Sequence, residues 1–87
     1  MRAIILSVNA FNQFIELQKS EPDAFKKLTK LLNETRKNPY EGICKPESLK
    51  HNLQGHWSRR ITDKHRLVYI VDDENITIIS CKFHYNK

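Results

Sequence analysis

The chain has 87 residues, a length that suits one small domain with a thin hydrophobic core, so we expect a single domain over residues 1–87. The composition, with 39% hydrophobic and 29% charged residues, two Gly and three Pro, excludes a disordered or low-complexity protein. The formal net charge of +5 favours an anionic partner, with nucleic acid first, although a merely solvated surface is the alternative.

No segment of the sequence predicts a membrane protein. The apolar run at the start is too short for the h-region of a signal peptide, and no stretch approaches the roughly 18 apolar residues of a membrane span. We therefore expect a cytoplasmic protein without membrane contact. Cys44 and Cys81 form no CxxC motif, and in a reducing cytosol we expect two free thiols.

The first element predicted is a short strand over residues 3–8, which are mostly apolar and include several β-branched side chains. A helix follows, with Asn9 as its expected N-cap. Helical spacing predicts an apolar stripe on it, formed by Phe11, Phe14, Ile15 and Leu17.

A second helix is predicted to begin at Ser20 or Glu21, because Pro22 suits a first turn. It ends before Asn38-Pro39, since the residue before a proline disfavours helix. Its expected buried face consists of Phe25, Leu28, Leu31, Leu32 and Thr35. The two helices form an αα-hairpin.

The second half changes to β character after an irregular stretch over residues 39–53. Strands are predicted over 57–62, 66–71 and 76–83. The two polar connections are of hairpin length and predict an antiparallel meander. The last two strands are apolar on both faces, which is typical of central strands. The predicted fold class is α+β, with helices packed on one face of one sheet.

The hairpins bring positive charge to one end of this sheet. Residues 44–66 hold six Lys and Arg against two acids, a net charge of +4. Counting from the turns places Arg60 beside Arg66 and Leu67, and the start of the Arg66 strand beside the end of the last strand, near His84. Guanidinium groups match phosphate oxygens, and a histidine exchanges protons near neutral pH.

If Glu47 folds over this patch, the site holds a base, an acid and a phosphate clamp, which is what metal-independent RNA cleavage requires. The pattern alone leaves structural alternatives open. Glu47 could simply pair with a nearby cation, Arg60 and Arg66 could be exposed strand residues, and His84 could be incidental. Trp57 is interpreted as a core side chain rather than a platform for base stacking, and Tyr85, if exposed, favours stacking.

Other chemistries fit the sequence less well. The four His and two Cys show no zinc-binding spacing, so no metal site is expected. With only Gly42 and Gly55 there is no glycine-rich phosphate loop, and there is no GxSxG nucleophile motif.

Four motifs carry a family resemblance, which covers nearly the whole chain. They are KPESLKHNL over 45–53, WSRRIT over 57–62, HRLVY over 65–69 and CKFHY over 81–85. Together with the order of elements they resemble the YoeB/Txe toxins of the RelE superfamily.

The resemblance implies a RelE-like fold and a toxin that cleaves mRNA in the ribosomal A site without a metal or other cofactor. By motif match, Glu47 would be the general base, His84 the general acid, and Arg66 would stabilise charge on the phosphate. The residues implied to bind or support the RNA are Lys50, His51, Arg60 and Tyr85.

The resemblance also implies partners: a cognate acidic antitoxin, the ribosome with mRNA, operator DNA through the toxin–antitoxin complex, and a second copy of the toxin. Without the resemblance, a non-catalytic basic module that binds nucleic acid or ribosomes is as plausible as a nuclease. A degenerate toxin held by an acidic antitoxin belongs to the same alternative.

The sequence departs from the family pattern near the expected base. Cys44 stands where a glycine is usual, and Ser48 replaces a usual proline, which could loosen the segment carrying Glu47. The first helix lacks the family's Trp- and Tyr-rich string. Asn86 and Lys87 extend past the terminal His-Tyr, and Lys87 is expected to lower the pKa of His84.

Overall fold

The computed structural model describes residues 2–50 and 54–82. The elements in chain order are β1 (Ala3–Leu6), α1 (Val8–Ser20), α2 (Pro22–Lys37), β2 (Glu47–Ser48), β3 (His56–Arg60), β4 (Arg66–Val71) and β5 (Asn75–Ser80). This order confirms the α+β prediction. Among the described residues, no helix is long and apolar enough to cross a membrane.

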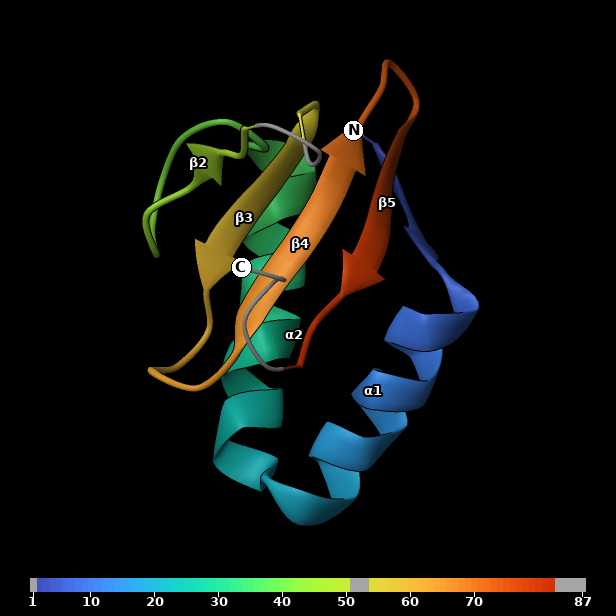
Figure 1. Cartoon of the computed structure of the whole chain (residues 1–87), viewed down its shortest axis with the longest axis vertical. Coiled ribbons are helices and arrows are strands. Elements are labelled where there is room, and N and C mark those ends of the chain that lie inside the picture. The colour runs from blue at the N-terminus through green and yellow to red at the C-terminus, as the bar shows by residue number, and fades with distance from the viewer. Residues whose placement is uncertain (1, 51–53, 83–87) are drawn as a thin grey trace.

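The strands form one sheet in the order β1-β5-β4-β3-β2 (Figure 1). The meander β3-β4-β5 is antiparallel, as predicted, and β1 adds to β5 in parallel. The strands β4 and β5 are central, which explains why both of their faces are apolar.

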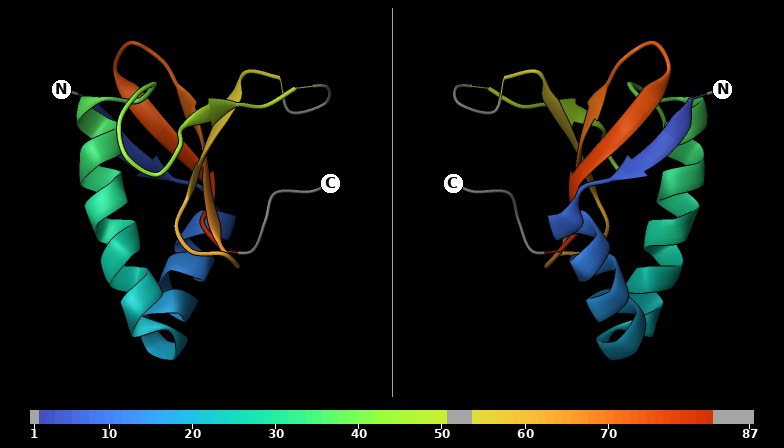
Figure 2. Two further views of the ribbon diagram at one scale, coloured as in Figure 1. Left: turned by 90° about the vertical axis from the view of Figure 1, so that its left-hand side faces the viewer. Right: turned by 90° about the vertical axis from the view of Figure 1, so that its right-hand side faces the viewer.

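The helical hairpin lies on one face of the twisted sheet (Figure 2). The core between the two layers contains small and aliphatic side chains from both helices, including Ala10, Leu17 and Leu28, against Leu67 and Ile78 of the sheet. Burial of this apolar surface is the main stabilising contribution that the layers share.

The start of α1 differs from the prediction. Ser7, not Asn9, is the N-cap, because its hydroxyl accepts a hydrogen bond from the Ala10 amide at 3.0 Å. The predicted apolar stripe is wrong at Phe11, which is 51% exposed. The helix instead buries Ala10 and Leu17, and Phe14 packs edge-to-face on Phe25 with 4.8 Å between the ring centroids.

The second helix follows the prediction more closely. It begins at Pro22 after Glu21, and its interior face buries Leu28, Leu31 and Thr35. Phe25 and Leu32 are half-buried against the same core. The 3.6-residue periodicity of α2 therefore identified its core face correctly.

The strand ends differ from the prediction by two or three residues. The first strand ends at Leu6 because Ser7 already caps the helix, and the third strand of the meander ends at Ser80 rather than residue 83. The strand β4 matches its predicted bounds. A register shift between Val68 and Tyr69 interrupts the pairing of β4 with β5. Counting residues from the turn could not predict this shift.

Candidate active site and its supporting residues

The meander brings two arginines together as the hairpin count predicted. Arg60 at the end of β3 lies directly opposite Arg66 at the start of β4. The counting rule also holds between β4 and β5, where Val71 pairs with Ile76 and, past the register shift, Val68 pairs with Ser80. The end of β5 at Ser80 thus lies toward the Arg66 end of the sheet.

The irregular segment contributes its carboxylate through a short strand that the sequence did not predict. In β2, Glu47 pairs with Ser58 of β3, which in turn pairs with Val68 of β4. With this register, the Glu47 side chain reaches Arg66 of β4 across the intervening strand β3. The Arg66 Nη1 donates to Glu47 Oε1 at 3.3 Å, although 19 positions separate the two residues.

This ion pair is open to solvent on its acidic side. The Glu47 side chain is 53% exposed and that of Arg66 is 22% exposed. Exposed ion pairs contribute at most about 1 kcal/mol to folding stability. The ion pair therefore contributes little to stability, and its carboxylate is accessible to a ligand.

The second arginine also has an acidic neighbour, so the two acids of the basic stretch 44–66 each form an ion pair with one of the two arginines. Arg60 forms an ion pair with Asp63 in the β3–β4 turn, and both side chains are largely exposed. Lys50 is exposed at the end of the first described range. The predicted site residues His51, His84 and Tyr85 lie outside the described residues.

The backbone before Glu47 takes conformations that favour glycine. Cys44 and Lys45 have φ angles of 64° and 50°, and Gly42 nearby has 114°. Cys44 therefore occupies a turn that glycine would adopt without strain. The Cys44 carbonyl accepts from the Arg60 amide at 2.9 Å, which ties this turn to β3.

A buried arginine, Arg59, organises the same segment, and the sequence interpretation missed it. Its guanidinium group donates to the hydroxyl of Tyr69 at 3.2 Å and to the carbonyls of Asn38, Glu41 and Ile43. The Arg59 side chain is completely buried. It holds residues 38–43 against the sheet, and these residues lead into β2.

Tyr69 completes this network. Its hydroxyl donates to the Pro39 carbonyl at 2.6 Å. Burial raises the pKa of Tyr69, so the phenol keeps the proton that this hydrogen bond uses. The alternation Trp57, Arg59, Ile61 points these side chains to one face, and that pattern could have identified Arg59 as inward-facing.

Trp57 packs on the core, as its interpretation from the sequence expected. It is half-buried against the core, and its ring lies 5.0 Å from that of Tyr40 at a tilted angle. Tyr40 belongs to the segment that Arg59 holds, so the two interactions fix the same loop.

His65 also belongs to the structure rather than to a basic surface. Its ring is fully buried, and Nε2 lies 3.0 Å from the carboxylate of Glu21, between the two helices. The hydrogen bond from His65 and its charge hold the pKa of Glu21 below its usual value, with a smaller contribution from Lys64. This contact joins the helical hairpin to the β3–β4 turn.

The comparisons with known proteins decide the family. The family model described as "YoeB-like toxin of bacterial type II toxin-antitoxin system" matches residues 6–85 of the chain. The chain belongs to this family. It is 45% identical to Toxin YoeB of Escherichia coli strain K12 over 82 residues, which cover 94% of the chain and 98% of that protein.

Solved structures of YoeB proteins match the fold as well. A YoeB dimer from Staphylococcus aureus superposes with a TM-score of 0.88 at 47% identity, covering 97% of this chain and 98% of that one. A YoeB–YefM complex from the same organism has a TM-score of 0.86 at 46% identity, covering 98% and 99%. The family resemblance predicted from four motifs is thus confirmed.

The described residues show no candidate metal centre. Within residues 2–50 and 54–82, no three His, Cys, Asp or Glu side chains gather in a way that could hold a metal ion. Both cysteines are free, Cys44 half-buried and Cys81 buried, as the sequence predicted.

Proposed function

We propose that this YoeB-family toxin is a ribosome-dependent, metal-independent endoribonuclease that cleaves mRNA in the A site and thereby inhibits translation. The observation that carries the proposal is the contact between Glu47 and Arg66 on an accessible end of the sheet. A carboxylate held 3.3 Å from a guanidinium, in the most basic part of the chain, suits proton transfer beside a phosphate.

In the proposed reaction, Glu47 removes the proton from the 2′-hydroxyl of the mRNA. The 2′-oxygen forms a bond to the adjacent phosphorus, and the bond from phosphorus to the 5′-oxygen breaks. His84 donates a proton to that leaving oxygen. The products are a 2′,3′-cyclic phosphate and a 5′-hydroxyl, and no co-reactant is consumed.

Arg66 is proposed to stabilise the negative charge that develops on the non-bridging oxygens of the phosphate. Its planar fork offers two parallel donors to phosphate oxygens, which a lysine does not. Because Arg66 already touches Glu47, a phosphate bound to the guanidinium group would lie beside the proposed base. The proposed RNA-positioning residues are Lys50, His51, Arg60 and Tyr85.

The proposed partners are an acidic antitoxin, the ribosome with its mRNA, operator DNA bound through the toxin–antitoxin complex, and a second toxin copy. The solved complex of YoeB with YefM and the solved YoeB dimer support the first and last of these by similarity. A cytoplasmic location follows from a ribosomal substrate.

A cell-free bacterial translation system with mapped mRNA ends tests the proposal. Purified wild-type protein should cut the message in frame at the A-site codon, and His84→Ala should leave it intact. An intact message with wild-type protein still bound to ribosomes would reject the nuclease proposal.

The second candidate is a degenerate toxin or a binding module without catalysis. It is favoured by the left-handed backbone at Cys44 and Lys45, in the segment that carries the proposed base. In a binding module the phosphate contacts supply the affinity, so a Glu47→Ala/His84→Ala variant should bind ribosomes as tightly as wild type, and neither protein should cut.

A further inference from the structure

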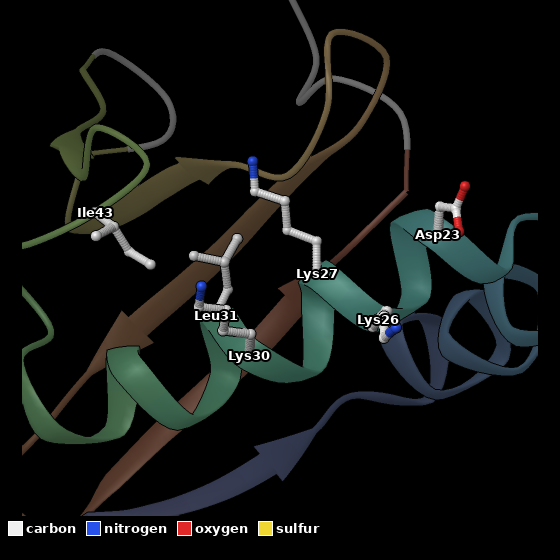
Figure 3. A pocket seen from close by; sticks show the side chains of 6 residues that line it. All are labelled: Asp23, Lys26, Lys27, Lys30, Leu31 and Ile43. Carbon is white, nitrogen blue, oxygen red and sulfur yellow. The ribbon is translucent and has the colours of Figure 1, made fainter.

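A buried hydroxyl without a partner lies beside the proposed base. Among the residues that the structure describes, three buried side-chain atoms have no hydrogen-bond partner: Thr35 Oγ1, His56 Nδ1 and Ser58 Oγ. The hollow of about 390 Å³ between α2 and the loop that carries Ile43 contains none of them (Figure 3). Of the three, it is Ser58 that pairs with Glu47 across the strands.

Ser58 faces away from the helices. Its neighbours in β3 point to the core, where Trp57 packs and where Arg59 donates to Tyr69. Successive residues of a strand point to opposite faces, so Ser58 points to the other face of the sheet. There it is paired with Glu47 on one side and with Val68 on the other. Paired residues share a face, and these three side chains therefore form a row across the sheet.

The contact between Glu47 and Arg66 crosses β3 beside this hydroxyl. Glu47 lies opposite Ser58. Arg66 lies opposite Arg60, two positions further along the same strand. The contact therefore passes over β3 between positions 58 and 60. Ser58 is completely buried although it points away from the helices, so its hydroxyl belongs to the floor of the candidate site.

The fold gains nothing from this hydroxyl. A buried hydroxyl without a partner is unfavourable, because it has lost its hydrogen bonds to water and has gained none among the described residues. An alanine would fill nearly the same space without that cost. Unpaired buried groups in native proteins call for an explanation, and a catalytic role is the one that the position of Ser58 supports.

The proposed base needs a second hydrogen-bond donor during the reaction. In the described part of the chain, Arg66 holds the Glu47 carboxylate, and the same guanidinium group is proposed to bind the phosphate. A glutamate released from its contact regains its rotamer freedom, whereas a general base must stay within hydrogen-bond reach of the proton it removes. Directly paired residues have Cβ atoms about 4.5–5.5 Å apart, so the hydroxyl at position 58 is within reach of the Glu47 carboxylate.

We propose that Ser58 is a positioning residue, whose hydroxyl donates a hydrogen bond to the Glu47 carboxylate when Arg66 turns to the phosphate. This inference rests on the proposed nuclease reaction and adds a residue to it. The hydroxyl holds one carboxylate oxygen, and the other oxygen stays free to accept the proton of the 2′-hydroxyl. Ser58 does not touch the reacting atoms, and it neither gains nor loses a proton.

Single-turnover cleavage on programmed ribosomes, at saturating protein, tests the proposal with Ser58→Ala, which removes one oxygen atom. We expect cleavage to slow by about 10- to 100-fold, the range for a lost hydrogen bond to a charged group. Ribosome binding should stay within about twofold of wild type, because cations that contact phosphates supply the affinity. The midpoint of urea denaturation should not fall, because the lost hydroxyl is unpaired in the free protein.

Two further variants show whether the hydroxyl acts through the base. In a Glu47→Ala background, Ser58→Ala should slow cleavage by less than about twofold more, because no carboxylate is left to position. Thr35→Val removes another buried hydroxyl that has no partner among the described residues, on the core face of α2. This control should cleave mRNA within about twofold of wild type, because Thr35 lies on the helical side of the sheet.

Cleavage by Ser58→Ala within about threefold of wild type would overturn the proposal. A further loss of about tenfold in the Glu47→Ala background would also overturn it, because the hydroxyl would then act independently of the base. A lower midpoint of urea denaturation for Ser58→Ala would make the role structural. Wild-type protein that leaves the mRNA intact would reject the nuclease proposal itself, so the two failures are distinguishable.

Discussion

Removing the buried arginine should destabilise the protein far more than removing its exposed neighbour in the next position. Arg59 makes four hydrogen bonds and is completely buried, whereas Arg60 makes an ion pair in which its side chain is 45% exposed and that of Asp63 is 90% exposed. Arg59→Met and Arg60→Met make the same chemical change at adjacent positions. The two variants therefore differ mainly in the burial of the side chain that is replaced.

The magnitude follows from the network. A hydrogen bond from a charged donor contributes about 1.5–3 kcal/mol, but water can reach some of the partly buried carbonyls once the guanidinium is gone. We expect Arg59→Met to lower the free energy of unfolding by about 3–5 kcal/mol. Arg60→Met should cost less than about 1 kcal/mol.

Urea denaturation followed by circular dichroism measures both values. At about 0.05–0.15 kcal/mol per residue, a chain of this length has a total stability of roughly 4–13 kcal/mol, so at the lower end of this range Arg59→Met is largely unfolded even without urea. Tyr69→Phe is the milder variant of the same network and should cost about 1–2 kcal/mol. A loss below 1 kcal/mol for Arg59→Met, or equal losses at the two arginines, would refute this account of the loop.

Three other predictions concern pH, thiols and salt. His65 lowers the pKa of Glu21, so the ionised carboxylate should stabilise the fold above the ordinary pKa of 4.5. This stabilisation should be lost as the pH falls through the pKa of Glu21 in the folded protein. In urea titrations, the difference in free energy of unfolding between wild type and Glu21→Gln should therefore shrink below pH 4.5. Burial raises the pKa of the Cys81 thiol to about 11, so a thiol reagent at pH 8 should label Cys44 in the native protein and Cys81 only after unfolding; equal rates would contradict the structure. Binding to ribosomes should weaken steeply between 50 and roughly 200 mM salt if, as proposed, the basic stretch 44–66 neutralises phosphates; an affinity that stays flat over this range would exclude that mode of binding.

The sequence predicted those parts of the fold that depend on local periodicity. The core face of α2, the bounds of β4 and the pairing of Arg60 with Arg66 all follow from helical spacing or from counting across a tight turn. The N-cap was misassigned because Ser7 and Asn9 are both good caps, and only the tertiary structure decides which one reaches the free amides.

The parts that failed depend on contacts distant in the chain. The strand β2 has two residues and no periodic signal of its own, so its pairing with β3 could not be counted. An arginine in a strand is usually exposed, and the interior position of Arg59 depends on carbonyls that a loop about 20 residues earlier presents to it. From the sequence, the approach of Glu47 to the basic patch is only a condition of the predicted site, and the structure shows the contact between Glu47 and Arg66.

Glu47 is proposed to act as the base in mRNA cleavage. Single-turnover cleavage on programmed ribosomes, at saturating protein, compares wild type with Glu47→Gln and with Glu74→Gln, an exposed glutamate in the turn before β5. We predict that Glu47→Gln slows cleavage by about 10²–10⁴-fold, as loss of a general base does, and that Glu74→Gln cleaves within twofold of wild type. Cleavage by Glu47→Gln at a rate within about threefold of wild type would contradict the assignment, because the amide cannot accept the 2′-hydroxyl proton.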